Sequence, residues 1–324
     1  SDLFGARQEA RMTRVADTDL FYLTTEVEPD ARVSYMLLRD YECIVDPRNP
    51  LRVTSMIYGP EMEVGSQRPP APFEMSELRM PRYKAADFLE PVAEAARGTI
   101  VEQSGAPTGM TLKVYLPNGY ANSEERYPVV YFTGARLALD AGHWDVALDN
   151  LIAAKRVAPM LVVFINPPDQ TFPTAVADLV ADSVVPLIDA NYRTIADRDH
   201  RACVATGSAS AVAISTVAKR ADLFSRLGVQ STFILDFMRE QIDPLVKATG
   251  DPKLRVYIEW SRYDLRNPHE AWDMGEIARE YDRMFRDRGH EVSGGEFNDG
   301  AGWPSWRSRT DRLLQALFPA TVAP

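Results

Sequence analysis

Short continuous apolar runs, separated by stretches of helical periodicity, dominate the chain after Gly98 and constrain its fold most strongly. Residues 129–132 (VVYF) and 160–165 (MLVVFI) are too short for helices and do not alternate, so they predict strands buried on both faces. Apolar residues recur at helical spacing in 144–152 and again in 176–188. Strands that alternate with helices predict a mainly parallel sheet, and therefore an α/β domain.

Further segments extend this pattern toward the carboxyl end. Residues 111–116 (TLKVYL) alternate as an outer strand should, whereas residues 202–205 (ACVA) form another buried run that leads into a helix through Ala218. The same criteria predict a strand over 254–260 and two more helices, over 275–288 and 309–318.

The first part of the chain has a different character. Residues 14–53 contain short β-rich runs, such as 20–25 and 32–38, which are broken by proline-containing turns and predict a small antiparallel β-sandwich. The prolines between residues 65 and 82 are typical of a stiff, extended connector. We therefore divide the chain into a β-sandwich over 1–64, a linker over 65–96 and an α/β domain over 97–324.

The length and composition support this division and exclude two classes of partner. A chain of 324 residues exceeds the usual span of one compact domain. Its 45% hydrophobic and 25% charged residues are ordinary for a soluble globular protein, and no stretch approaches the roughly 20 apolar residues that cross a bilayer. The net charge of -10 repels phosphate backbones. We expect a soluble protein with no membrane span and no nucleic-acid partner.

The cysteines argue against a metal centre. Cys43 and Cys203 lie in different predicted domains, and neither has a Cys or His at metal-ligand spacing. We therefore expect two buried free thiols, and neither a metal nor a cofactor. The chain begins at Ser1 without an initiator Met, which fits removal of a signal peptide and trimming equally well. The compartment stays open between secreted or periplasmic and cytoplasmic.

A strand, a small-residue turn and a helix meet at residues 206–211 (TGSASA). In an α/β-hydrolase the nucleophilic serine stands on such a turn, and the residues two before and two after it are small. Ser208 is placed there, although Thr206 and Ser210 stand where the pattern has glycine. A serine that caps a helix N-terminus explains the same residues without any chemistry, and the local motif alone favours that interpretation.

The wider sequence resembles the enterochelin (ferric siderophore) esterase family along nearly the whole chain. The resemblance rests on segments 19–24 (DLFYLT), 31–35 (ARVSY), 46–50 (DPRNP), 127–131 (YPVVY), 159–164 (PMLVVF), 185–189 (VPLID) and 297–303 (FNDGAGW). It implies an α/β-hydrolase fold with a mainly parallel central sheet, preceded by an early-set, immunoglobulin-like β-sandwich. A carbohydrate role for that sandwich has fold analogy as its only warrant.

Roles carried over by the resemblance show where this chain departs from the family. Ser208 falls on the nucleophile, the N–H of Ala209 on one oxyanion donor, and the loop at Gly134 and Ala135 on the second. Ala301 falls on the catalytic histidine. Alanine cannot accept the serine proton, and a positioned base contributes roughly 10²- to 10⁴-fold in rate. The loop over 166–174, where the family clamps its acidic substrate, also lacks an arginine.

Another histidine would have to replace the missing base. His269 is the serious candidate, because it follows the 254–260 strand, in the region where an α/β-hydrolase carries its acid. Asp264 in the same region could be that acid, but an aspartate beside Arg262 and Arg266 is more often a salt-bridged loop residue. The remaining histidines are interpreted as surface or packing residues: His143, His200 and His290.

Two functional hypotheses follow. The first is a pseudo-esterase that keeps the fold and acts through a protein partner or a small ester or carboxylate ligand, as a homo-oligomer or within a larger assembly. The second is an active serine carboxylesterase that uses Ser208 and a relocated base. An engineered alanine at position 301 ranks last, because it leaves the altered glycines unexplained. Four tryptophans could line a pocket or interface, or simply fill the core: Trp260, Trp272, Trp303 and Trp306.

Overall fold

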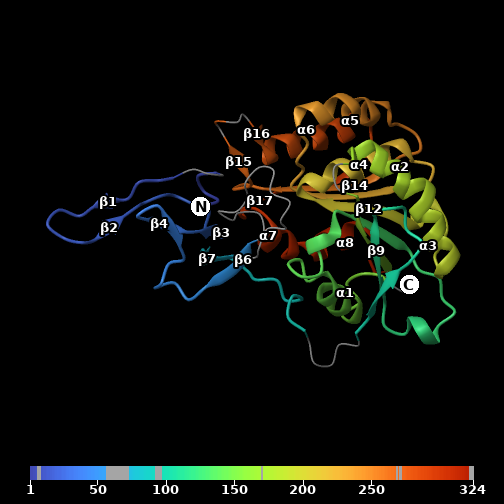
Figure 1. Ribbon diagram of the computed structural model, residues 1–324, viewed down its shortest axis with the longest axis horizontal. Coiled ribbons are helices and arrows are strands. Elements are labelled where there is room, and N and C mark those ends of the chain that lie inside the picture. Colours follow the sequence, from blue (N-terminus) through green and yellow to red (C-terminus); the bar gives the residue numbers. More distant parts are fainter. Residues whose placement is uncertain are drawn as a thin grey trace.

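A computed structural model describes residues 1–5, 9–55, 73–91, 97–168, 171–267, 269 and 272–320. Figure 1 shows a large α/β part, with helices on both faces of a central sheet, beside a smaller part made of β-strands. No helix of the described residues is long and apolar enough to cross a membrane.

The central sheet has eight strands in the order β17-β14-β13-β12-β10-β11-β9-β8. Six strands are mutually parallel, whereas β8 and β9 run antiparallel at one edge. The mainly parallel sheet predicted from the apolar runs is therefore confirmed. The strands are β8 (Thr99–Gln103), β9 (Thr111–Leu116), β10 (Val129–Thr133), β11 (Leu161–Asn166), β12 (Arg201–Thr206), β13 (Arg226–Gln230), β14 (Arg255–Ser261) and β17 (Glu291–Phe297).

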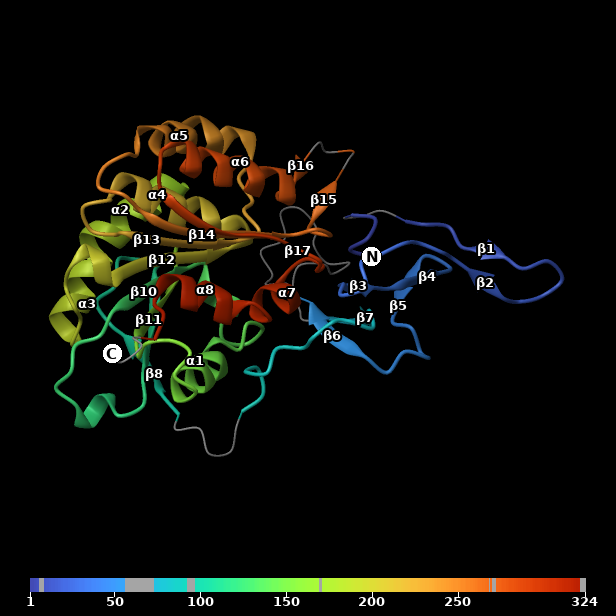
Figure 2. The same ribbon diagram turned by 180° about the vertical axis from the view of Figure 1, so that it is seen from behind.

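Helices cover both faces of this sheet (Figures 1 and 2). One face carries α2 (Pro173–Leu179), a π-helical turn (Val180–Val184), α3 (Val185–Asn191), α4 (Ser210–Lys219), α5 (Asp236–Ala248) and α6 (Met274–Asp287). The other face carries α1 (Trp144–Ala153), α7 (Trp303–Arg307) and α8 (Thr310–Leu317). The central strands β10 and β12 are buried along their whole length, because helices pack on them from both sides.

Short elements join these layers. Single 3-10 turns are η1 (Tyr120–Asn122), η2 (Ala135–Leu137), η4 (Arg198–His200) and η5 (Gly207–Ala209). A two-stranded ribbon, β15 (Arg266–Asn267) with β16 (Trp272–Asp273), follows β14.

The N-terminal part is all β, as predicted. A three-stranded antiparallel sheet has the order β3-β7-β6, from β3 (Arg32–Tyr35), β7 (Phe73–Arg79) and β6 (Arg52–Ser55). Two hairpins accompany it, β4 (Leu37–Arg39) with β5 (Glu42–Ile44), and β1 (Thr13–Arg14) with β2 (Phe21–Tyr22). Figures 1 and 2 show the β1–β2 hairpin projecting away from the rest of the molecule.

Two expectations about this region need correction. Part of the expected linker, residues 73–79, is the middle strand of the three-stranded sheet, while 65–72 and 92–96 lie outside the described residues. The prolines on either side of β7 concealed it, although Met75 is buried and the strand pairs on both edges. Cys43 is exposed on β5, so only Cys203 is a buried thiol.

The two parts of the chain are joined by a buried ion-pair network. The guanidinium of Arg32, on β3, donates to Asp299 Oδ1 at 2.8 Å and to Ser305 Oγ at 2.6 Å. It also lies 3.4 Å from Glu77 on the neighbouring strand β7. Because Asp299 directly follows the β17 strand region, the N-terminal sheet is fastened to the same loop that contains Ala301.

Candidate active site

The turn between β12 and α4 lies at the carboxyl edge of the parallel strands, where ligand sites of α/β sheets are found. The strand ends at Thr206 in an extended conformation, and Gly207 then takes a left-handed φ of 55°. Ser208 follows and is exposed, whereas Thr206, Gly207 and Ser210 are buried. The sequence prediction of a sharp strand-to-helix turn that presents Ser208 is therefore matched by the structure, and its role as nucleophile stays a prediction.

The predicted oxyanion residues come together beside this turn. Gly134 follows β10 with a left-handed φ of 70°, and a Cβ placed on it would lie 2.3 Å from the Cβ of Ala209. Thr133 donates its hydroxyl to the carbonyl of Ala209 at 3.5 Å, and Ala135 is buried at the start of η2. Only glycine fits at position 134, because a side chain there would collide with the turn.

Asp264 is a buried carboxyl group after β14. Its Oδ2 accepts from Ser231 Oγ at 2.5 Å and from the N–H of Ser261 at 3.2 Å, while Oδ1 accepts from the N–H of Leu265 at 2.9 Å. Trp306 Nε1 donates to the same Ser231 hydroxyl at 2.8 Å. Ser231 itself follows β13 with a left-handed φ of 55°. The acid expected after β14 is thus held by a chain of buried hydrogen bonds.

The arginines near Asp264 have other partners, which corrects the salt-bridge alternative. Arg262 pairs with Glu28 at 2.7 Å and with Glu296 at 3.3 Å, and Arg266 donates to the carbonyl of Leu3. Burial raises the pKa of Asp264 to about 6, although its hydrogen bonds from Ser231 and the backbone oppose the shift.

Asp264→Asn is expected to flatten the dependence of stability on pH. The folded pKa is about 6 against 3.8 for the unmodified group, so protonation favours the folded state. Stability from this carboxyl is complete below pH 4 and is lost as the pH rises through 6, by up to about 3 kcal/mol. Denaturant unfolding of wild type and variant between pH 4 and 7.5 isolates the effect as the difference between the two curves. Parallel curves would contradict the assignment.

Ala301 lies in the loop between β17 and α7, the place that the resemblance assigns to the catalytic histidine. It is 5% exposed, and its methyl group has no atom that accepts a proton. The neighbouring Gly300 packs against the carboxyl of Asp2, which would meet any Cβ placed there. This loop is therefore enclosed by the N-terminal residues as well as by α7.

The histidines lie elsewhere. His200 contacts the Asp197 carboxylate at the start of β12, and His290 bonds Thr249 Oγ1 before β17, so both are at the opposite edge of the sheet. His143 precedes α1. His269 is exposed between β15 and β16, and its backbone N–H donates to Asn267 Oδ1 at 3.0 Å. Within the described ranges, no histidine ring is hydrogen-bonded to Ser208 or Asp264.

Comparison with known proteins places this geometry in a family. The sequence profile of a family described as "Putative esterase" matches residues 105–317, about two thirds of the chain. The chain belongs to this esterase family. A curated relative, the endo-1,4-beta-xylanase/feruloyl esterase of Xylanibacter ruminicola, is 27% identical over 227 residues, which are 64% of this chain. The matched region spans 29% of that relative's length.

Solved structures of esterases share the fold. The enterobactin esterase of Shigella flexneri, solved in the presence of enterobactin, has a TM-score of 0.70 at 15% identity and covers 96% of this chain and 84% of its own. A feruloyl esterase module of Clostridium thermocellum, complexed with sinapinate, has a TM-score of 0.56 at 15% identity and covers 73% of this chain and 93% of its own. The α/β-hydrolase fold implied by the sequence resemblance is therefore confirmed.

Aromatic side chains around the turn of this esterase-family chain were not anticipated as a group. Phe233 lies beside the turn, because its N–H donates to the carbonyl of Gly207 at 3.3 Å and to Ser210 Oγ at 3.2 Å. Its ring is 5.3 Å from that of Trp272, centroid to centroid. Phe172 and the exposed Phe237 form a second pair, at 6.4 Å. By contrast, the remaining three tryptophans expected near the site are buried: Trp260, Trp303 and Trp306.

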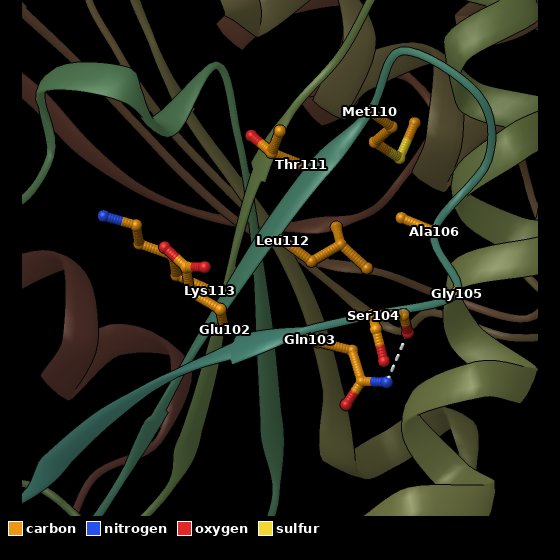
Figure 3. A pocket seen from close by; sticks show the side chains of 9 residues that line it. All are labelled: Glu102, Gln103, Ser104, Gly105, Ala106, Met110, Thr111, Leu112 and Lys113. Carbon is orange, nitrogen blue, oxygen red and sulfur yellow. Dashed lines mark hydrogen bonds between the residues drawn. The ribbon is translucent and has the colours of Figure 1, made fainter.

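A groove of about 290 Å³ lies away from these residues, on the hairpin of β8 and β9 (Figure 3). Glu102 and Lys113 project to one side of the hairpin, whereas Met110 and Leu112 lie on the other. None of the predicted site residues lines it. Within the described part of the chain, no three His, Cys, Asp or Glu side chains are grouped so that they could hold a metal ion.

Proposed function

We propose that this chain is an esterase-fold protein, similar to enterochelin and feruloyl esterases, that hydrolyses esters little or not at all and acts through binding. The observation that carries the proposal is Ala301, buried in the loop after β17 where the base should stand. Without a base the hydroxyl of Ser208 keeps its proton at neutral pH. A retained Asp264 does not compensate, because an acid in such a unit acts through the histidine.

An aromatic ester or carboxylate is the small ligand that we propose. Phe233 and Trp272 stand beside the turn, and Phe172 and Phe237 form a second aromatic pair on neighbouring elements. Aromatic faces bind planar rings by stacking and edge contacts. The names of the similar proteins, which include ferulic acid and enterobactin esterases, support the same class. A protein partner at this surface is the other form of the binding hypothesis.

An active carboxylesterase is the second candidate, and the exposure of Ser208 is the observation that favours it. In that case His269 would have to supply the base, although its ring is exposed on the β15–β16 ribbon. The two candidates differ in one measurable property, which is turnover that depends on the Ser208 hydroxyl.

Hydrolysis of p-nitrophenyl acetate and butyrate by the purified chain is expected to match that of Ser208→Ala. The physical reason is the missing base, whose loss removes roughly 10²- to 10⁴-fold in rate. Ser104→Ala is the matched control, because Ser104 is also exposed but lies on the connection after β8. Calorimetric titration with ferulic acid is expected to show binding without turnover. Wild-type turnover that disappears in Ser208→Ala but persists in Ser104→Ala would refute the proposal.

A further inference from the structure

The backbone of the turn singles out Gly207 rather than Ser208. In the hydrolase fold the nucleophile itself stands on the strained residue of the strand-to-helix turn, which aims its side chain out of the sheet. Here the residue with left-handed φ is Gly207, at 55°, whereas Ser208 does not have a positive φ. Ser208 belongs to the single 3-10 turn that leads into α4. The apex of the turn is therefore one residue earlier than sequence alignment places it.

The small neighbours of the turn agree with this register. Centred on Gly207, the residues two before and two after are Ala205 and Ala209, and both are small. Ala209 is in the contact that requires a small residue, since its Cβ would lie 2.3 Å from a Cβ at Gly134. Centred on Ser208, the same positions are Thr206 and Ser210, which is the departure noted in the sequence. The shift by one residue removes that anomaly.

The direction of a side chain at position 207 points the same way. A Cβ there would lie 3.1 Å from Cη2 of Trp306, so the indole would have to give way by a few tenths of an ångström. The Nε1–H of that indole donates to Ser231, whose hydroxyl donates to Asp264. A side chain at position 207 would thus face α7 and the acid, where a base after β17 could reach it, whereas Ser208 faces solvent.

We propose that Gly207 occupies the position of the family's nucleophile, and that this chain has lost its nucleophile as well as its base. The inference rests on the proposed function in taking Ala301 as the position of the lost base. It also predicts that the single change Ala301→His does not restore hydrolysis, because the remaining hydroxyl, of Ser208, stands beside the apex and not on it.

The test uses the full chain in three forms: Ala301→His, Gly207→Ser with Ala301→His, and Gly207→Ala with Ala301→His. The alanine double variant is the matched control, since it carries the same left-handed strain without a hydroxyl. Thermal melting verifies that each form is folded. Hydrolysis of p-nitrophenyl butyrate is expected to rise about 100-fold over this control in the serine double variant alone. If Ala301→His is as active, and loses that activity with Ser208→Ala, the inference is overturned.

A crystal structure of the serine double variant decides the case even if turnover stays low. The serine Oγ introduced at position 207 is expected within about 3 Å of the new imidazole. An imidazole that reaches Ser208 Oγ instead, or neither hydroxyl, overturns the inference. Failure of the proposed function is distinguishable, because it would show as Ser208-dependent turnover in the wild-type chain, which contains neither change.

Discussion

Arg309→Met is expected to lower the free energy of unfolding by about 3 to 5 kcal/mol, the range for removing one partner of a buried ion pair. Arg309 is nearly inaccessible and donates to Glu259 Oε1 at 2.7 Å, to Asp299 Oδ2 at 2.6 Å and to Ser261 Oγ at 3.2 Å. Burial alone lowers the pKa of this guanidinium, but the charges of Glu259 and Asp299 raise it by more. Methionine fills the space without the charge, so two buried carboxylates lose a partner.

Arg312→Met is the matched control for this change. Both guanidinium groups lie over the ring of Phe297, at 4.9 Å for Arg309 and 5.0 Å for Arg312, so both variants lose one cation–π contact. Arg312 is exposed, and its loss is expected to cost less than about 1 kcal/mol. Denaturant unfolding monitored by tryptophan fluorescence measures both. Equal small losses would show that the buried pairs contribute little net stability.

Arg32→Met is expected to have an effect of similar size, about 3 to 5 kcal/mol, with a distinct location. Arg32 is buried, and it connects the N-terminal sheet to Asp299 and Ser305 of the α/β part. Burial lowers the pKa of Arg32, and Asp299 and Glu77 raise it by more, so the group is held charged. Its removal leaves both carboxylates short of a partner. Amide hydrogen exchange is expected to rise in β3, β7 and the 298–302 loop together.

Arg79→Met separates this effect from a general loss of charge on the N-terminal sheet. Arg79 pairs with the same carboxylate, Glu77, at 2.7 Å, but its side chain is 41% exposed. We expect a loss of less than about 1 kcal/mol and unchanged exchange in the 298–302 loop. If Arg32→Met accelerated exchange in β3 and β7 but left that loop protected, the proposed coupling between the two parts would be wrong. Because Arg32 and Arg309 share Asp299, their effects are not expected to add.

The predicted elements that the structure confirms are those with a strong local signal. Continuous apolar runs identified β10 and β11, because a strand between two helical layers must be apolar on both faces. The strand β13 went unpredicted: its sequence RLGVQ is short and contains Gly228. That glycine is explained only in three dimensions, since a Cβ there would lie 3.0 Å from Leu317 and 3.2 Å from Val204.

The same distinction holds for the N-terminal part. Its β character follows from short runs between turns, but the strand β7 was hidden by the prolines around it. The strand is stabilised by pairing with β3 on one edge and β6 on the other, contacts between residues far apart in the chain. Strand preference depends on such neighbours more than on local sequence.

The order of residues alone indicates the fold class, the place of the turn at 206–211, the acid after β14 and the alanine after β17, because apolar patterns and motif spacing are local properties. The folded chain was needed to show that Asp264 is bonded to Ser231 instead of the neighbouring arginines, and that the N-terminal sheet is fastened to the Ala301 loop. It was also needed to locate the left-handed residue at Gly207. Backbone angles and ion-pair partners of this kind are set by contacts between distant segments, so no local pattern contains them.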